Sequence, residues 1–217
     1  MRLAKQPAKK RIGEILKRLK KSYPDAKCSL NYTNAFELLV ATILSAQCTD
    51  ERVNFVTKTL FKKYPGPKEF LRTPERELQE DIRTTGFFRN KTRSIQGASK
   101  RLLENFGGKV PSTMEELLTL PGVARKTANV VLGNVFHIAD GVVVDTHVSR
   151  LSQRLALTKE TKPEKIEQDL MKLVPKNDWI QFGHMIIMHG RYVCKAQKPD
   201  CPNCVLNDLC PSSTVKV

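Results

Sequence analysis

Apolar residues recur at helical spacing along most of the chain. Over residues 9–22 they fall at i, i+3, i+4 and i+7 with lysines and arginines between them, which is typical of a basic amphipathic helix. The same period predicts further helices near residues 34–48, 50–64, 73–82, 91–107, 112–120, 123–135, 146–154, 161–173 and 178–194. No segment shows the alternation of a strand, so about ten helices with short connections predict an all-α protein.

A tight hairpin between two of these helices stands out. Ser112, with Glu115 three residues later, is typical of a capping box at the start of the first helix. Pro121 and Gly122 end that helix, because proline cannot continue it and glycine tolerates a positive φ. The second helix begins near Val123, and the unpaired N–H groups of its first turn form a seat for a phosphate. An ordinary corner between two helices has the same pattern.

A lysine and an aspartate follow this hairpin. Lys126 lies in the first turn of the second helix, where partial desolvation and the helix dipole would lower its pKa and free its amine as a nucleophile. The alternative for Lys126 is a surface lysine that binds phosphate. Asp145 follows an apolar run and is alternatively the N-cap of residues 146–154. The two are about twenty residues apart, so one helix and its return loop would let them converge.

The charge of the chain limits its partners. A net charge of +15 and a pI near 9.7 favour an acidic polymer. Charge alone does not separate nucleic acid from an anionic membrane, but no apolar run approaches the ~20 residues of a membrane helix. The N-terminus has no hydrophobic core of the signal-peptide kind, so we expect an intracellular, cytoplasmic protein with no membrane partner.

Four of the six cysteines crowd together near the end of the sequence. They are Cys194, Cys201, Cys204 and Cys210. In a reducing compartment such a group is more typical of a metal site than of disulfides. The spacing suits a cubane iron–sulfur cluster, with zinc as the competing interpretation.

Taken together, these motifs resemble the endonuclease III family of helix-hairpin-helix DNA glycosylases. The resemblance rests on Leu120–Ala128, on Val144–His147 and on the cysteine spacing. Ala124 stands where the family usually has a second glycine. The resemblance implies two helical lobes with a DNA-binding groove between them. A helix-hairpin-helix lobe would span residues 27–138, and a 4Fe-4S cluster lobe would span residues 1–26 and 139–217.

The resemblance also implies an activity. The chain would be a bifunctional DNA glycosylase and AP lyase in base excision repair, which removes oxidised pyrimidines by base flipping. Lys126 would attack C1′ to form a Schiff base, Asp145 would stabilise the developing positive charge, and β-elimination would follow. The partner would be double-stranded DNA with damaged bases or abasic sites, bound by a monomer associated with the nucleoid. The four cysteines would hold a structural 4Fe-4S cluster.

Further residues would contact DNA by the same resemblance. Gln47 would fill the gap left by the flipped base and Phe87 would wedge against the opposite strand, although a helix-end residue and a core aromatic are the simpler interpretations. The remaining expected DNA contacts are Gly122, Val123, Ala124, Arg125, His147, Lys195 and Lys198. A structural role for His147 and solvated loop charges at Lys195 and Lys198 are the alternatives.

Three rival functions remain open at this point. A monofunctional mismatch or adenine glycosylase of the same fold typically lacks a lysine at position 126. A non-enzymatic DNA-binding module would use the hairpin for phosphates only and would not need Asp145. A zinc protein with a chance hairpin would be colourless, whereas an iron–sulfur protein is brown.

Overall fold

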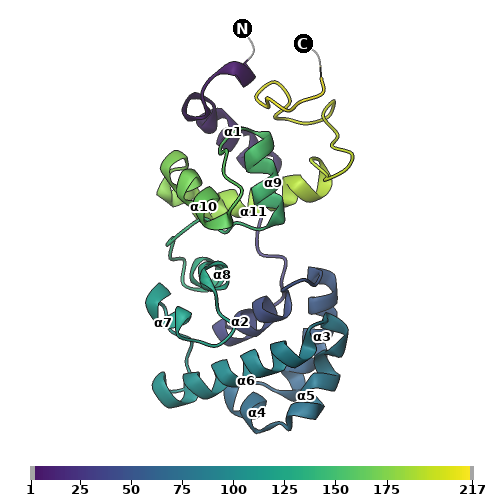
Figure 1. Cartoon of the computed structure of the whole chain (residues 1–217), viewed down its shortest axis with the longest axis vertical. Helices are drawn as coiled ribbons and strands as arrows, with labels where there is room; N and C mark the ends of the chain where they lie inside the picture. The colour runs from purple at the N-terminus through teal and green to yellow at the C-terminus, as the bar shows by residue number, and fades with distance from the viewer. Residues whose placement is uncertain (1–2, 216–217) are drawn as a thin grey trace. The chain divides into compact units, whose positions relative to one another are not determined.

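The computed structural model describes residues 3–215, and these residues form helices and no strand (Figure 1). The predicted all-α fold is confirmed. The α-helices are α1 (Ala8–Ser22), α2 (Ala35–Leu44), α3 (Asp50–Lys63), α4 (Pro67–Arg72), α5 (Glu75–Ile82), α6 (Phe88–Asn105), α7 (Met114–Leu118), α8 (Arg125–Val135), α9 (Thr146–Arg154), α10 (Pro163–Leu173) and α11 (Trp179–Tyr192). Short 3-10 helices are η1 (Leu3–Lys5), η2 (Arg83–Thr85) and η3 (Lys176–Asp178).

The chain divides into two compact units. One, which we call the hairpin unit, comprises residues 28–140, and the other, the cluster unit, comprises the described residues of 1–27 and 141–217. The lobe boundaries given by the resemblance stay a prediction. Residues 1, 2, 216 and 217 of that prediction lie outside the described residues.

The hairpin unit is built around α2. This helix is apolar on nearly all sides and packs against α3, α6 and α8, which is typical of a helix buried in a core. Asn34 caps its N-terminus, because its side-chain oxygen accepts a hydrogen bond of 3.0 Å from the backbone N–H of Glu37. The buried α2 therefore fixes the start of the loop that carries Gln47.

Two helix starts differ from the sequence prediction. Thr113, not Ser112, caps α7: its hydroxyl accepts from the N–H of Glu116 at 3.3 Å and donates to the Glu116 carboxylate at 2.7 Å. The helix cap therefore lies one residue later than predicted, where the backbone is extended, and the Glu116 carboxylate bonds to the cap's hydroxyl, not to its backbone N–H as in a capping box. Helix α5, expected to start near residue 73, begins at Glu75, and the hydroxyl of Thr73 donates to the carbonyl of Glu69 in the first turn of α4. Helix α4 was missed because six residues are too few to show a period.

The cluster unit packs α1 against α10 and α11, and α9 against the same two helices. Arg11 lies on the apolar face of α1 and is only 2% exposed. Its guanidinium donates to the carbonyls of Leu155 and Leu209 at 2.8 and 2.7 Å. The segment after α11 contains no helix within the described residues (Figure 1). Arg11 thus ties this irregular segment to α1 and to the end of α9.

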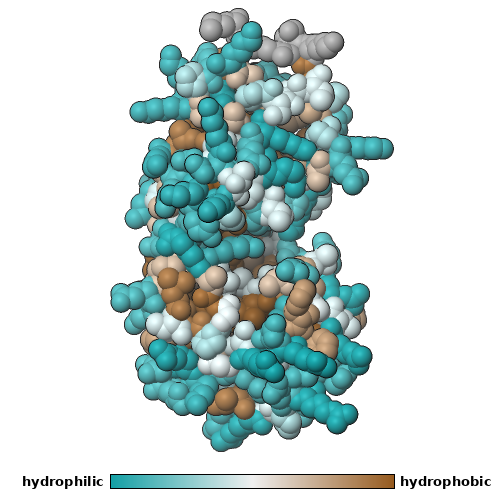
Figure 2. Space-filling view, viewed as in Figure 1, coloured by the Kyte–Doolittle hydropathy of each residue, from teal (hydrophilic) through white to brown (hydrophobic). Residues whose placement is uncertain are grey.

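Hydrophilic side chains cover most of the face shown in Figure 2. Lysines dominate the exposed positions of α1, and the isoleucines and leucines of its apolar stripe are buried. Among the described residues, no helix combines the length and the apolar content that a bilayer-spanning segment needs.

Candidate functional site

The hairpin between α7 and α8 is a tight turn seated on α6. The N–H of Val123 donates to the carbonyl of Leu120 at 3.1 Å, and both side chains are buried. Gly122 has φ +77°, and a Cβ added there would lie 2.5 Å from the Cβ of Ser94 and 2.7 Å from its Oγ. Pro121 rests against Gly97 of the same helix, where an added Cβ would lie 3.1 Å from the proline ring. Only glycine therefore fits at position 122.

Helix α8 begins directly after this turn. Ala124 is its N-cap, in an extended conformation and without a side-chain capping hydrogen bond. A helix start of this kind offers backbone N–H groups and the positive end of the dipole to an anion. The Arg125 guanidinium lies 3.5 Å from the carboxylate of Asp140 in the same unit. The geometry suits a phosphate seat whose adjacent cation is held in place.

Lys126 is the second residue of α8, in its first turn, and its side chain is exposed. The chain itself therefore does not provide the partial desolvation that we expected for this lysine. The exposed ammonium lies in the same first turn as the phosphate seat. Its position is suited to reach a ligand held by the hairpin.

Asp145 belongs to the cluster unit. It follows the buried Val142 and Val144, and its Oδ1 accepts a hydrogen bond of 2.8 Å from the N–H of Val148. The alternative expected for this residue, an N-cap of α9, is thus present. Capping fixes the orientation of the carboxylate and does not consume its charge. The convergence of Asp145 with Lys126 stays a prediction.

His147 packs inside the cluster unit. Its Nδ1 lies 3.2 Å from Nη2 of Arg150, and a Cβ added to Gly190 would come within 2.8 Å of the same nitrogen. Burial lowers the pKa of His147 below its ordinary value. These contacts suit a packed, structural histidine, and its predicted contact with DNA stays a prediction.

Two exposed loop tips of the hairpin unit share an unusual backbone. Gln47, between α2 and α3, has φ 53°, and Phe87, the N-cap of α6, has φ 48°. The left-handed region is uncommon for residues other than glycine. Phe87 is 61% exposed, so the core interpretation of this aromatic is wrong. Both side chains stand at tips that a ligand can reach.

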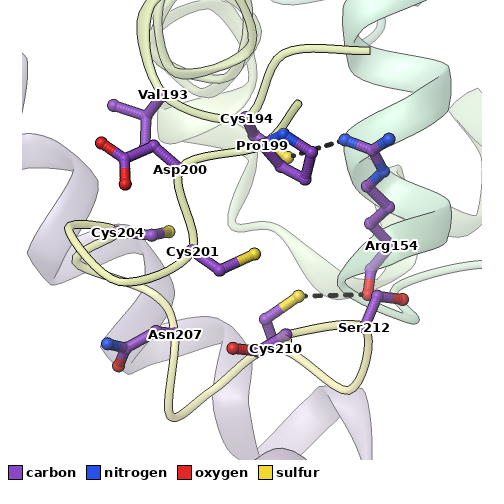
Figure 3. Close-up of a pocket in the computed structure, with 11 residues that line it drawn as sticks. Arg154, Val193, Cys194, Pro199, Asp200, Cys201, Cys204, Asn207, Cys210 and Ser212 are labelled. Carbon is purple, nitrogen blue, oxygen red and sulfur yellow. Dashed lines mark hydrogen bonds between the residues drawn. The ribbon is translucent and has the colours of Figure 1, made fainter. Parts of the chain in front are cut away.

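All four C-terminal cysteines line one cavity of the cluster unit, with a volume of about 170 Å³ (Figure 3). Nη1 of Arg154 donates to Sγ of Cys194 at 3.3 Å, and Nε2 of His189 lies 3.3 Å from Sγ of Cys204. The sulfur atoms of Cys201 and Cys210 point into the same space in Figure 3. The end of α9, the helix α11 and the segment after α11 thus meet around the four thiols.

This donor set fits an iron–sulfur cluster. Burial raises the pKa of the Cys204 thiol to about 11 and also raises that of Cys210, so these thiols need metal to become thiolates. Hydrogen-bond donors such as Arg154 and the N–H of Leu206, 3.4 Å from Sγ of Cys204, favour the thiolate form. Among the described residues, no group of three or more His, Cys, Asp or Glu is arranged to hold a single metal ion.

The predicted loop lysines, Lys195 and Lys198, are exposed beside this cavity. Arg154 donates to the carbonyls of Lys195 and Ala196 at 2.8 and 2.7 Å. The backbone under the first lysine is therefore fixed while its side chain is free to meet a phosphate.

Sequence reasoning missed Arg154 and His189, which contact the cysteines, and the buried cations Arg11 and Lys91. No sequence signal marks the first pair, since both depend on tertiary contacts. Arg11 and Lys91 each lie four residues before a buried isoleucine on the same helix. That spacing places them on buried faces and could have identified them.

Two family models match the chain. One, described as "HhH-GPD superfamily base excision DNA repair protein", matches residues 40–176, and the other, "Iron-sulfur binding domain of endonuclease III", matches residues 194–210. The endonuclease III of Synechocystis sp. is 60% identical over 94% of this chain and 94% of its own length. That of Bacillus subtilis is 48% identical over 93% and 92%. A solved structure of a trapped endonuclease III–DNA covalent intermediate is 45% identical, with a TM-score of 0.92 over 96% of this chain and 98% of that chain.

Proposed function

Because the chain belongs to the endonuclease III family of base excision DNA repair proteins, we propose that Lys126 carries its chemistry on oxidised pyrimidines in duplex DNA. The protein is a DNA glycosylase and AP lyase, and its cofactor is a 4Fe-4S cluster. One observation supports the choice of nucleophile above the others. Lys126 is an exposed lysine in the first turn of α8, directly behind the hairpin.

DNA is held first by its backbone. The helix start at Ala124 and the turn at Gly122 receive a phosphate near the lesion through backbone N–H groups. Val123 anchors the turn in the core, and the guanidinium of Arg125, 3.5 Å from the Asp140 carboxylate, offers further N–H donors beside the seat. A net charge of +15 strengthens every such contact and makes binding fall steeply with salt.

A base inside a duplex is out of reach of an amine, so the damaged nucleotide is flipped out. Gln47 enters the gap with a side chain that can both donate and accept hydrogen bonds. Phe87, 61% exposed, presses against the opposite strand, where an aromatic ring can stack on a base. Flipping costs a few kcal/mol of stacking, which is smallest for a damaged base.

The amine of Lys126 then attacks C1′ of the flipped nucleotide. The N–C1′ bond forms as the bond between C1′ and the base breaks, and the base leaves with the bonding electron pair and is protonated. Ring opening gives a Schiff base, which acidifies the neighbouring C2′ proton. Loss of that proton expels the 3′ phosphate by β-elimination, and water then releases Lys126.

Asp145 supports this step through charge. Positive charge grows on the sugar as the base departs, and a carboxylate fixed at the start of α9 stabilises it. The same carboxylate accepts and returns protons during ring opening and elimination. Its capping bond to Val148 holds it in one orientation throughout.

Cys194, Cys201, Cys204 and Cys210, which line one cavity, would hold the iron–sulfur cluster, and the metal–thiolate bonds would cross-link a segment with little apolar core. Base excision needs no electron from it. The cross-linked segment presents Lys195 and Lys198 to phosphates. His147, the second residue of α9, lies two residues after Asp145 in the sequence.

The substrate is double-stranded DNA with oxidised or ring-saturated pyrimidines, such as thymine glycol, or with abasic sites. The enzyme acts as a monomer. It works in the cytoplasm, where its positive charge keeps it on the nucleoid.

Base release and strand cleavage on a thymine glycol duplex test this function together. Wild type should do both at matched rates. Lys126→Ala should lose both, and Asp145→Asn should bind the duplex normally but slow base release by a factor of about 100, as for loss of a key electrostatic group. Base release by Lys126→Ala at the wild-type rate would show a monofunctional enzyme and refute the proposal.

A further inference from the structure

Lys91 is a buried cation that the reaction above does not use. Only 4% of it is exposed, although it lies in the first turn of α6, close to the Phe87 tip. We propose that Lys91 is a positioning residue, which fixes the tips at Gln47 and Phe87 relative to each other so that both enter the duplex together. The proposal rests on the DNA roles of those tips in the proposed function.

The ammonium of Lys91 bridges the two loops. Its Nζ donates to the carbonyl of Leu44 at 2.8 Å and to the carbonyl of Thr85 at 2.7 Å. Leu44 ends α2 three residues before Gln47, and Thr85 ends η2 two residues before Phe87. One buried charge therefore joins the base of one tip to the base of the other.

Electrostatics explains why a lysine suits this place. The last carbonyls of a helix have no hydrogen-bond partners within it and carry the negative end of the dipole. A cation at the end of α2 therefore donates to a free carbonyl and also interacts favourably with the dipole. Burial lowers the pKa of Lys91, and the Cys48 thiol opposes that shift. Removing the ammonium leaves two carbonyls, those of Leu44 and Thr85, without this charged donor.

Both tips need external support. Gln47 and Phe87 each hold a left-handed backbone, which persists for such residues only where the surroundings impose it. The N–H of Lys91 also donates to the carbonyl of Phe87 at 3.0 Å. Lys91 thus holds the Phe87 tip through its backbone and ties it to the Gln47 tip through its side chain.

The test compares a step that needs both tips with one that needs neither. Lys91→Met keeps the length and the buried packing of the side chain but removes its donors. Lys58→Met, at an exposed position of α3, removes the same charge from the hairpin unit and serves as control. Single-turnover base release from a thymine glycol duplex requires flipping, whereas borohydride trapping on single-stranded abasic DNA does not.

We expect Lys91→Met to slow base release by about tenfold or more, as for a misplaced positioning group, while trapping stays within about twofold of wild type. The double variant Lys91→Met/Gln47→Ala should lose less base-release rate than the product of the two single losses, because both changes act through the Gln47 tip. Lys58→Met should leave both rates near wild type. If Lys91→Met does not fold, Lys91→Gln, whose shorter side chain carries a neutral donor in place of the ammonium, takes its place, and base release should again be slowed more than trapping.

Equal losses in both assays would show that Lys91 has only a general structural role and would overturn the proposal, as would an unchanged rate of base release. Absence of trapping in the wild type would instead overturn the proposed function, so the two failures are distinguishable. Multiplicative losses in the double variant would also contradict action through Gln47.

Discussion

Gly122→Ala should destabilise the hairpin and weaken DNA binding for two separable reasons. The backbone at position 122 has φ +77°, which is unfavourable for any residue with a Cβ. The new methyl would also lie 2.5 Å from Cβ and 2.7 Å from Oγ of Ser94 on α6. Neither atom is the end of a long side chain that could swing away, so the turn itself must shift.

The two costs can be assigned magnitudes. A left-handed backbone costs about 1–2 kcal/mol for a residue other than glycine, and overpacking adds about 1–3 kcal/mol. Gly122→Ala should therefore lower the free energy of unfolding by about 2–5 kcal/mol. In a Ser94→Gly background both clashing atoms are gone, so the same change should cost only the backbone term of about 1–2 kcal/mol.

Urea unfolding of the wild type, Gly122→Ala, Ser94→Gly and the double variant measures these free energies. Far-UV circular dichroism reports both units, whereas fluorescence of Trp179, the single tryptophan of the sequence, reports the cluster unit. In Gly122→Ala the urea midpoint of the dichroism transition should fall, whereas that of the fluorescence transition should be unchanged. Fluorescence anisotropy with an abasic-analogue duplex at fixed salt should show weaker binding for Gly122→Ala, with partial recovery in the double variant. Equal costs of Gly122→Ala in both backgrounds would refute the packing explanation.

Two further predictions concern the cluster unit. Arg11→Met should lower the free energy of unfolding of this unit by about 3 kcal/mol, because the buried carbonyls of Leu155 and Leu209 lose a charged donor. The visible absorption of the cluster should be lost at a lower urea concentration than in wild type. An unchanged urea midpoint by Trp179 fluorescence would contradict this. Burial lowers the pKa of His184 below 6.5, so the unfolded chain binds its proton more readily, and the stability present above pH 6.5 should be lost as the pH falls. The urea midpoint should therefore drop between pH 7.5 and pH 5.5, a drop that His184→Gln reduces, and an undiminished drop in that variant would assign the effect to other groups.

Helix positions followed from the sequence wherever a period had room to repeat. The basic amphipathic pattern gave α1, with its apolar stripe buried, and Asp145 caps a helix over the residues expected, Thr146–Arg154. Short elements were harder. Helix α4 has six residues, and the choice between Ser112 and Thr113 as cap depends on backbone angles that adjacent hydroxyl residues do not reveal.

The candidate site was predictable where it depends on local motifs, such as the hairpin at Gly122 and the cysteine spacing. Contacts between distant segments were not. Sequence spacing does not show that Lys91 reaches the carbonyl of Leu44, or that Arg154 reaches the sulfur of Cys194. Lys126 is exposed where partial desolvation was expected, because sequence spacing does not show which side chains pack beside the first turn of α8.

The central claim is that Lys126 is the nucleophile, and the most direct test identifies the residue that becomes linked to DNA. The enzyme would be mixed with an abasic duplex, reduced with borohydride and digested, and the DNA-linked peptide sequenced by mass spectrometry. We predict linkage at Lys126 alone and no trapped complex with Lys126→Ala. Linkage at another lysine or at the terminal amine, or undiminished trapping in the variant, would contradict the account.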